Sequence, residues 1–173
     1  ILALFLLLNL AHFAQATTIT FDGTYNNYEQ IKSGHYFQTA YDNAFVDVVF
    51  DTEWKYWNSG YNDLQGVLYR KDGLVQSAFI NFVAKPNSKV TLLDFDLGNY
   101  WGYGTTTQFQ VFDLTDLVNP LLGLYNIDVP NSSAKNYAVN LSSTTGFQLK
   151  IGPDIYNNGI DNIRFETAPV PEP

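Results

Sequence analysis

Aromatic side chains concentrate in two short stretches that are otherwise rich in asparagine and glycine. The first contains Trp54, Tyr56, Trp57 and Tyr61, and the second contains Tyr100, Trp101 and Tyr103. Flat rings exposed on loops stack on the faces of sugar rings. Nearby polar side chains that suit sugar hydroxyls are Asn58, Asn62, Asp63 and Asn99. We therefore predict a glycan-binding surface. The alternative is that the rings cap the open ends of a sandwich and bury apolar area.

A pair of carboxylates raises the question of catalysis. Glycoside hydrolysis needs two carboxylates at a fixed separation, and Asp94 and Asp96 are the closest pair. Residues two apart on a strand share a face, so both are predicted to lie opposite Leu93, Phe95 and Leu97. The alternative is an ordinary polar face in contact with solvent.

Other enzyme classes find little support in the residue types. The chain has no Cys and two His, and only His35 lies in the predicted mature chain, where we interpret it as a loop or strand-edge residue. No Gly-x-Ser-x-Gly motif occurs, and the glycine-rich segment 98–104 lacks the Lys-Ser/Thr of a phosphate-binding loop. These observations argue against a serine triad, a multi-histidine metal centre and a nucleotide site.

Asp161 is the best single candidate for a metal ligand. It shares strand parity with Ile163 and Phe165, so its carboxylate is predicted to lean toward the core, where an unpaired charge is costly. Calcium is the ion that suits an acidic chain without Cys. The alternatives are backbone N–H donors or an ion pair with Arg70 or Lys150.

Composition bounds the class of protein and its partners. The chain has 173 residues, of which 46% are hydrophobic and 15% charged, which predicts one well-packed domain. A formal net charge of -8 with no basic run argues against nucleic acid as a partner.

Both ends of the chain predict export. Residues 1–10 are apolar apart from Asn9, and Ala14-Gln15-Ala16 follows as a small-x-small cleavage pattern. We predict that residues 1–16 are a signal peptide that lacks its start, that the mature chain begins at Thr17, and that the protein is secreted through the Sec route. Residues 167–173 are rich in proline and predict a linker.

Hydrophobic alternation of period two runs through the region between the ends. It is clearest at residues 46–50, 78–84 and 147–151, which predict strands with one core face. Further predicted strands are residues 17–21, 66–70, 90–97, 106–113, 121–127, 137–141 and 160–166. Short turns rich in Gly, Asn, Asp and Pro separate them, and no helical stripe appears. Residues 17–166 are therefore predicted to form an all-β antiparallel sandwich that is jelly-roll-like.

Two parts of the chain resemble a known family. Val170 with Pro171, Glu172 and Pro173 resembles the opening of the PEP-CTERM sorting signal of bacterial surface proteins. Residues 90–97 and 159–165 are similar to segments of PEP-CTERM proteins whose ectodomain is like carbohydrate-binding jelly rolls. The resemblance implies sorting by an exosortase at the cell surface. It also implies a calcium site in which Asp22 on the first strand joins Asp161 on the last.

Three hypotheses on function follow. The first is a non-catalytic protein that binds or organises extracellular polysaccharide, with an optional structural calcium ion. The second is a carbohydrate-active enzyme of the glycoside hydrolase type that uses Asp94 and Asp96. The third is a structural or adhesive protein of a biofilm matrix, without a specific ligand.

Overall fold

The structure, a computed structural model, describes residues 14–22, 25–31, 44–71, 76–103 and 106–170. Within these ranges the secondary structure consists of strands: β1 (Gln15–Ile19), β2 (Val46–Phe50), β3 (Trp54–Trp57), β4 (Val67–Arg70), β5 (Ala78–Ala84), β6 (Ser88–Asn99), β7 (Thr106–Asp113), β8 (Asp116–Asp128), β9 (Lys135–Ser143), β10 (Gly146–Ile151) and β11 (Asn158–Pro169). No helix in this part of the chain has the length and apolar character needed to span a bilayer.

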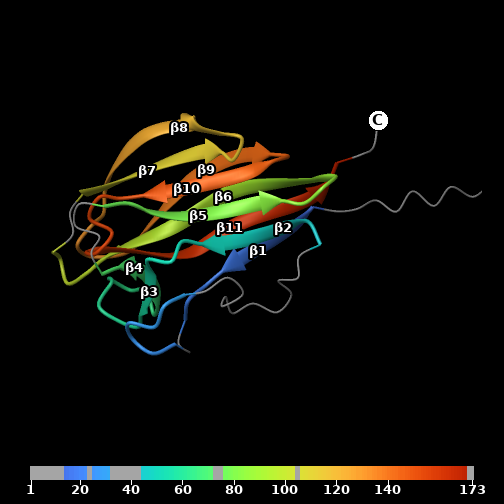
Figure 1. Cartoon of the computed structure of the whole chain (residues 1–173). Coiled ribbons are helices and arrows are strands. Elements are labelled where there is room, and N and C mark those ends of the chain that lie inside the picture. The colour runs from blue at the N-terminus through green and yellow to red at the C-terminus, as the bar shows by residue number, and fades with distance from the viewer. Residues whose placement is uncertain (1–13, 23–24, 32–43, 72–75, 104–105, 171–173) are drawn as a thin grey trace, which may run out of the picture.

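The strands form two antiparallel sheets that pack face to face as a jelly-roll-like sandwich (Figure 1), so the predicted fold class is confirmed. One sheet has the order β3-β4-β11-β6-β9, and β1 pairs with β11 beside β4. The other has the order β2-β5-β10-β7-β8. Every strand predicted from alternation is present, although several bounds differ by a few residues.

The core lies between the sheets and follows the predicted alternation. Val46, Val48 and Phe50 are buried on β2, as are Phe147 and Leu149 on β10. Removing such side chains from water is the main source of stability in a sandwich. The period-two pattern therefore identifies the inward face correctly on these strands.

Strand β6 departs from simple alternation. The prediction placed Leu93 on the core face, but Leu92 and Phe95 are the buried residues and Leu93 is half-buried. A register shift in the pairing with β11 is the reason, because Asp94 and Leu92 lie opposite the adjacent residues Arg164 and Phe165, which leaves Leu93 as an extra residue on β6. An extra residue at a β-bulge reverses the parity of every residue that precedes it.

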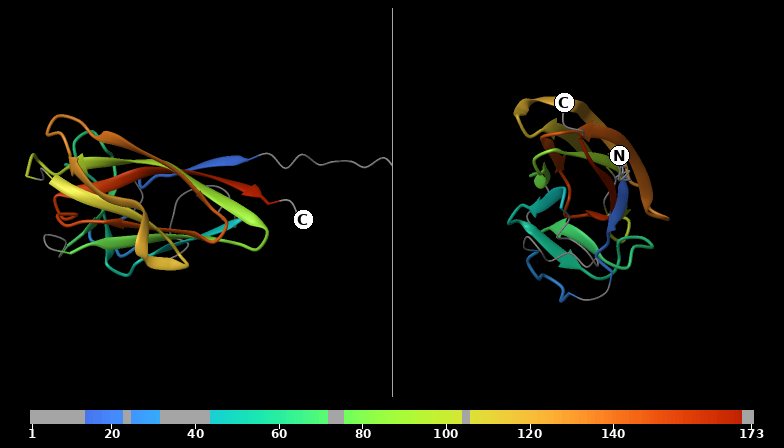
Figure 2. Two further views of the ribbon diagram at one scale, coloured as in Figure 1. Left: turned by 90° about the horizontal axis from the view of Figure 1, so that it is seen from above. Right: turned by 90° about the vertical axis from the view of Figure 1, so that its right-hand side faces the viewer.

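The two ends of the described chain meet at one end of the sandwich, as Figure 2 shows. Gln15 pairs with Thr167. β11 continues past the boundary expected at Glu166 as far as Pro169, which pairs with Ser88 at the start of β6, so residues 167–169 of the predicted linker belong to the sheet. The sorting motif Pro171, Glu172 and Pro173 lies outside the described residues, as does His35.

The opposite end of the sandwich carries the loops of interest. β6 begins at Ser88 beside Pro169 and ends at Asn99 beside Asn158. A twelve-residue strand is roughly 36 Å long. The loops after Asn99 and before Asn158 are therefore far from the two chain ends.

Candidate functional site

Two residues predicted to bind glycan belong instead to the core. Trp54 and Tyr56 lie on β3, which the sequence analysis placed in a loop, and both are 0% exposed. The Trp54 indole N–H donates a hydrogen bond to the Phe79 carbonyl over 2.7 Å. A ring with no accessible face cannot stack on a sugar, so the prediction for these two residues is wrong. The physical reason is strand parity, which turns Trp57 to the other side.

The two aromatic stretches do lie side by side. Tyr61 and Tyr100 form an isolated antiparallel bridge. The Trp101 N–H donates to the Gly60 carbonyl over 2.9 Å, and the Asn62 N–H donates to the Asn99 carbonyl over 3.1 Å. Backbone hydrogen bonds thus join two loops that are about forty residues apart in the sequence.

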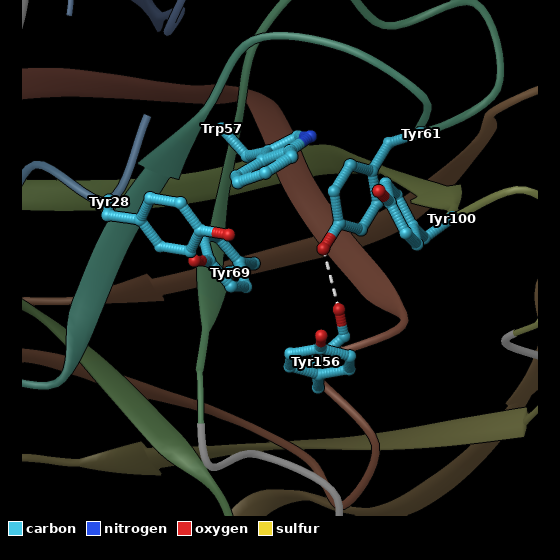
Figure 3. Close-up of a pocket in the computed structure, with 6 residues that line it drawn as sticks. All are labelled: Tyr28, Trp57, Tyr61, Tyr69, Tyr100 and Tyr156. Carbon is cyan, nitrogen blue, oxygen red and sulfur yellow. Dashed lines mark hydrogen bonds between the residues drawn. The ribbon is translucent and has the colours of Figure 1, made fainter. Parts of the chain in front are cut away.

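Six aromatic residues enclose a small cavity of about 70 Å³ on the outer side of β3 and β4, and we call it the aromatic cage: Tyr28, Trp57, Tyr61, Tyr69, Tyr100 and Tyr156. Figure 3 shows Tyr28, Trp57 and Tyr69 on one side of it, Tyr61 and Tyr100 on the other, and Tyr156 below. The Tyr61 hydroxyl donates to the Tyr156 carbonyl over 2.6 Å. Of the predicted residues, Trp57, Tyr61 and Tyr100 therefore belong to one enclosed site.

Next to the cage lies an open groove of about 620 Å³, which we call the Trp101 groove; it is lined by Ser59, Gly60, Asn62, Asn99, Trp101, Gly102 and Asn131. Trp101 forms its aromatic wall and is 73% exposed, and its neighbour Tyr103 is 74% exposed. The centroids of the Tyr100 and Trp101 rings are 6.4 Å apart, so this pair separates the groove from the cage.

Asparagine side chains hold the walls of the groove together. The Asn62 amide donates to the Pro130 carbonyl over 2.8 Å, and its oxygen accepts from the Asn99 backbone N–H. The Asn99 amide donates to the Asn131 side-chain oxygen over 2.9 Å. Because Asn62 and Asn99 make these internal bonds, they position the groove, and Asn131 and Ser59 are its exposed polar edge.

The remaining predicted polar residues have structural partners. The Asn58 N–H donates to the Asn27 side chain over 2.9 Å, and Asp63 accepts from the Ala134 N–H over 2.6 Å. Asp63 thereby fixes the segment after Asn131 against the loop that bears Asn62. Among the residues that the structure describes, the lining of the groove includes no charged side chain.

The backbone at Trp101 adopts the left-handed conformation. Trp101 has a φ of 48° and precedes Gly102, with a φ of 78°. A bulky residue in the left-handed region is strained by about 1 kcal/mol or more. Gly60, with a φ of 86°, is needed below it, since a Cβ there would lie 2.6 Å from the Trp101 indole nitrogen. Strain together with an exposed indole is a combination that folding alone does not favour.

Asp94 and Asp96 lie in a polar network on the outer face of β6. The Arg164 guanidinium donates two hydrogen bonds to Asp94, from Nε to Oδ1 over 2.6 Å and from Nη2 to Oδ2 over 2.7 Å. The Asn136 amide bridges Asp94 and Asp96 over 3.0 and 2.8 Å, and Asn162 donates to Asp96 over 2.9 Å. The carboxylate oxygens are thus occupied by neighbouring donors, which favours the alternative of an ordinary polar face.

We expect Asp94→Asn to act on stability rather than on turnover. The substitution removes a bidentate pair whose arginine is 51% exposed, so the free energy of unfolding should fall by about 1 kcal/mol. Urea denaturation measures this loss, and Lys85→Gln is a control that removes the surface pair with Asp47. Release of reducing ends from a polysaccharide by the wild type and not by Asp94→Asn would contradict this interpretation.

Asp161 is buried as predicted, at 1% exposed, but it pairs with Asp96 of the outer face, and a register shift between Asp161 and Arg164 interrupts the expected parity with Ile163. Its Oδ1 accepts the Phe21 backbone N–H over 2.9 Å. Burial raises the pKa of Asp161 to about 7, against backbone hydrogen bonds from Asn162 and Phe21 that lower it, while the charges of Asp22 and Asp96 raise it further.

The three predicted partners of Asp161 were a calcium ion, backbone N–H donors and a basic side chain. The backbone N–H bond is present, and Arg70 contacts Glu53 instead, with 3.7 Å between Nη2 and Oε2. Within the described ranges, no group of three or more His, Cys, Asp or Glu side chains is arranged to hold a metal ion. Calcium takes six to eight oxygens, so Asp22 and Asp161 would need backbone carbonyls and water to complete a site.

No protein-family model matches the chain, and no curated protein sequence matches it either. Solved structures match with low identity. The chain is similar to the GH26-CBM35 β-(1,4)-mannanase of Podospora anserina at 15% identity and a TM-score of 0.43, with 91% of this chain aligned to 28% of that one. This chain thus spans less than a third of the mannanase.

Two smaller structures match over most of both chains. The CBM35 from Cellvibrio japonicus Abf62 aligns with 91% of this chain and 95% of its own, at 9% identity and a TM-score of 0.39. TmCBM61 in complex with β-1,4-galactotriose aligns with 84% of this chain and 99% of its own, at 12% identity and a TM-score of 0.36. The likeness concerns the fold alone.

Several residues of the cage and the groove were not predicted from the sequence. Tyr28 and Tyr156 of the cage lie in asparagine-rich turns, the same signal that led to the other loop aromatics. Tyr69 lies in a predicted strand and gave no such signal. Asn131 of the groove follows Pro130 and is brought near by folding alone.

Proposed function

We propose that this domain is a non-catalytic module that binds a neutral extracellular polysaccharide at the Trp101 groove. The observation that carries the proposal is Trp101 itself, which is 73% exposed and held in a left-handed conformation over a polar groove. An exposed flat ring offers a stacking surface for a sugar face, and the amide and hydroxyl of Asn131 and Ser59 suit its hydroxyls.

The charge of the groove supports a neutral ligand. Its lining residues are uncharged, while the whole chain has a formal net charge of -8. An acidic protein repels polyanionic glycans unless cations intervene. The groove volume of about 620 Å³ lies in the range of ligand sites.

Affinity electrophoresis of the purified protein through gels of neutral and acidic polysaccharides tests this proposal. We expect retardation on at least one neutral polymer, with no effect of the acidic ones. Equal mobility in every gel would overturn the proposal. Each gel is run with calcium and with chelator, so that a role of calcium is scored in the same experiment.

Secretion, sorting by an exosortase at a bacterial surface and a structural calcium ion at Asp161 belong to the same proposal. The position of the groove supports it, because β6 separates Asn99 from the end of β11, after which the sorting motif follows. Attachment near Pro171 would leave the groove directed away from the cell.

One observation favours self-association in a matrix as a second candidate function. β8 is the edge of its sheet and, in the part of the chain that the structure describes, pairs with β7 alone. Five large apolar side chains on it are about half exposed or more: Leu117, Val118, Leu121, Leu124 and Tyr125. Long apolar edge strands pair readily with a second copy.

We expect a Val118→Lys/Leu121→Lys double variant to abolish any such association. Val118 is 83% exposed and Leu121 48%, so charge can be added with little effect on the fold. Sedimentation velocity over a hundredfold range of protein concentration measures the self-association. A wild type that stays monomeric throughout would rule out this second function.

A further inference from the structure

The aromatic cage differs from the groove in size and chemistry. Its volume of about 70 Å³ is far below the 300–1,000 Å³ of sites that enclose larger ligands, whereas the groove reaches about 620 Å³. Its lining consists of aromatic residues, without the carboxylate or amide side chains that usually meet sugar hydroxyls. A small headgroup fits this cavity better than a sugar ring does.

The rings form walls at steep angles to one another. The Trp57 ring makes an angle of 79° with Tyr28, 78° with Tyr69 and 88° with Tyr100. Burial raises the pKa of Tyr61 and of Tyr69, so their phenols stay neutral over the physiological range. The faces of neutral aromatic rings carry partial negative charge and attract cations, above all N-methylated ammonium ions.

Two further features of the cage bear on its ligand. One is a cation beside the Tyr28 ring, and the other is a pair of buried polar atoms that an oxygen of the ligand could bond. The Lys71 ammonium already lies 5.7 Å from the centroid of the Tyr28 ring, within the range of a cation–π contact, so a ligand cation binds at the other rings of the cage. The Tyr69 hydroxyl and the Trp57 indole nitrogen are buried without a hydrogen-bond partner among the described residues, and Tyr69 is 2% exposed. An oxygen next to the ammonium group would give one of these two polar atoms a partner.

We propose that the aromatic cage binds an N-methylated ammonium headgroup with a nearby oxygen, of which choline is the simplest soluble example. The rings of Trp57, Tyr69 and Tyr156 surround the methyl groups, and the ligand oxygen pairs with the Tyr69 hydroxyl or the Trp57 N–H. The net charge of -8 adds a general attraction for cations.

Calorimetric titration of the full chain with choline tests this site. The control ligand is 3,3-dimethyl-1-butanol, which has the same shape but a carbon in place of the nitrogen. We expect choline to bind at least about tenfold more tightly, because only the cation interacts with the ring faces. Equal affinity for the two compounds, or no binding of choline up to 50 mM or so, would overturn the proposal.

Variants locate the binding within the cage. Tyr156→Leu removes one wall but keeps the carbonyl that Tyr61 bonds, and should weaken choline about tenfold. Tyr69→Phe keeps the ring and loses the hydroxyl, so it should weaken choline and leave tetramethylammonium, which has no oxygen, unchanged. Tyr103→Leu, at an exposed ring outside the cage, is the matched control. Unchanged choline affinity in Tyr156→Leu would contradict the assignment.

Choline titration and gel retention of the same variants distinguish binding at the cage from polysaccharide binding at the groove. Trp101→Ala should lose retention on the gels and keep choline affinity within about twofold, because Trp101 is not part of the cage lining. Tyr156→Leu should show the reverse. Retention without choline binding would therefore refute the cage ligand alone.

Discussion

Replacing Trp101 with alanine is expected to abolish polysaccharide retention while the protein stays folded. The ring is 73% exposed and forms the aromatic wall of the groove. Aromatic anchors of binding sites are worth about 2 kcal/mol or more, which is a factor of about 30 in Kd. Affinity electrophoresis measures the loss, and circular dichroism checks the fold.

A glycine at the same position separates binding from stability. Trp101 has a φ of 48°, which glycine adopts without strain. Trp101→Gly should therefore lose retention and yet raise the free energy of unfolding, by up to about 1 kcal/mol. Leu117→Ala, at an exposed apolar side chain of β8, is the control for nonspecific effects of lost apolar surface. Undiminished retention in both Trp101 variants would place the glycan elsewhere.

Asp161→Asn is expected to make the protein less sensitive to pH. Burial raises the pKa of Asp161 to about 7, whereas in the unfolded chain the group titrates near the ordinary value of 3.8. Between these values the folded protein binds one more proton at Asp161 than the unfolded chain does, so the contribution of Asp161 to stability is largest at low pH and falls as the pH rises. The loss is about 1.4 kcal/mol per pH unit up to the folded pKa of about 7 and levels off above it, hence about 3 kcal/mol between pH 5 and pH 8.

The asparagine variant lacks this titration. Its side-chain oxygen still accepts the Phe21 N–H, and the charge that burial disfavours is gone. Relative to the wild type, the variant should thus gain about 3 kcal/mol between pH 5 and pH 8 in urea unfolding with chelator present. A difference between the two proteins that does not change with pH would contradict the expectation.

Asp116→Asn is a control in which the pH dependence of stability should change in the opposite direction. Hydrogen bonds from the Asn119 side chain and from the Asn119 and Val118 backbones lower the pKa of Asp116, so its contribution to stability is present at neutral pH and is lost in acid. Added calcium gives a further comparison. Because calcium needs the ionised carboxylate, a bound ion would restore stability at pH 8 in the wild type and not in Asp161→Asn.

The fold could be predicted because its signals are local. Alternation identified the inward residues of β2, β5 and β10, such as Val48, Ile80 and Leu149. Side chains alternate between the two faces of a strand, so one buried residue predicts that the residues two and four positions further along are also buried. The burial of Asp161 was predicted correctly, but the parity with Ile163 that suggested it is interrupted by a register shift on β11.

The predictions that were wrong depend on features that are not local in this sense. Trp54 and Tyr56 lie in a short strand, β3, whose turn-like neighbours hid its alternation. Leu93 was assigned to the wrong face because a bulge on β6 shifts the register, and this bulge depends on the partner strand β11.

The sequence by itself determined the antiparallel sandwich and the inward faces of regular strands such as β2, β5 and β10, because each follows from residues within a few positions of one another. Only the tertiary structure decided which rings are accessible and which residues share a site. The cage draws Tyr28, Tyr69 and Tyr156 from segments far apart in the chain, and the groove acquires Asn131 in the same way. Such neighbours are set by strand order and loop packing, which involve contacts across the whole chain that no local pattern records.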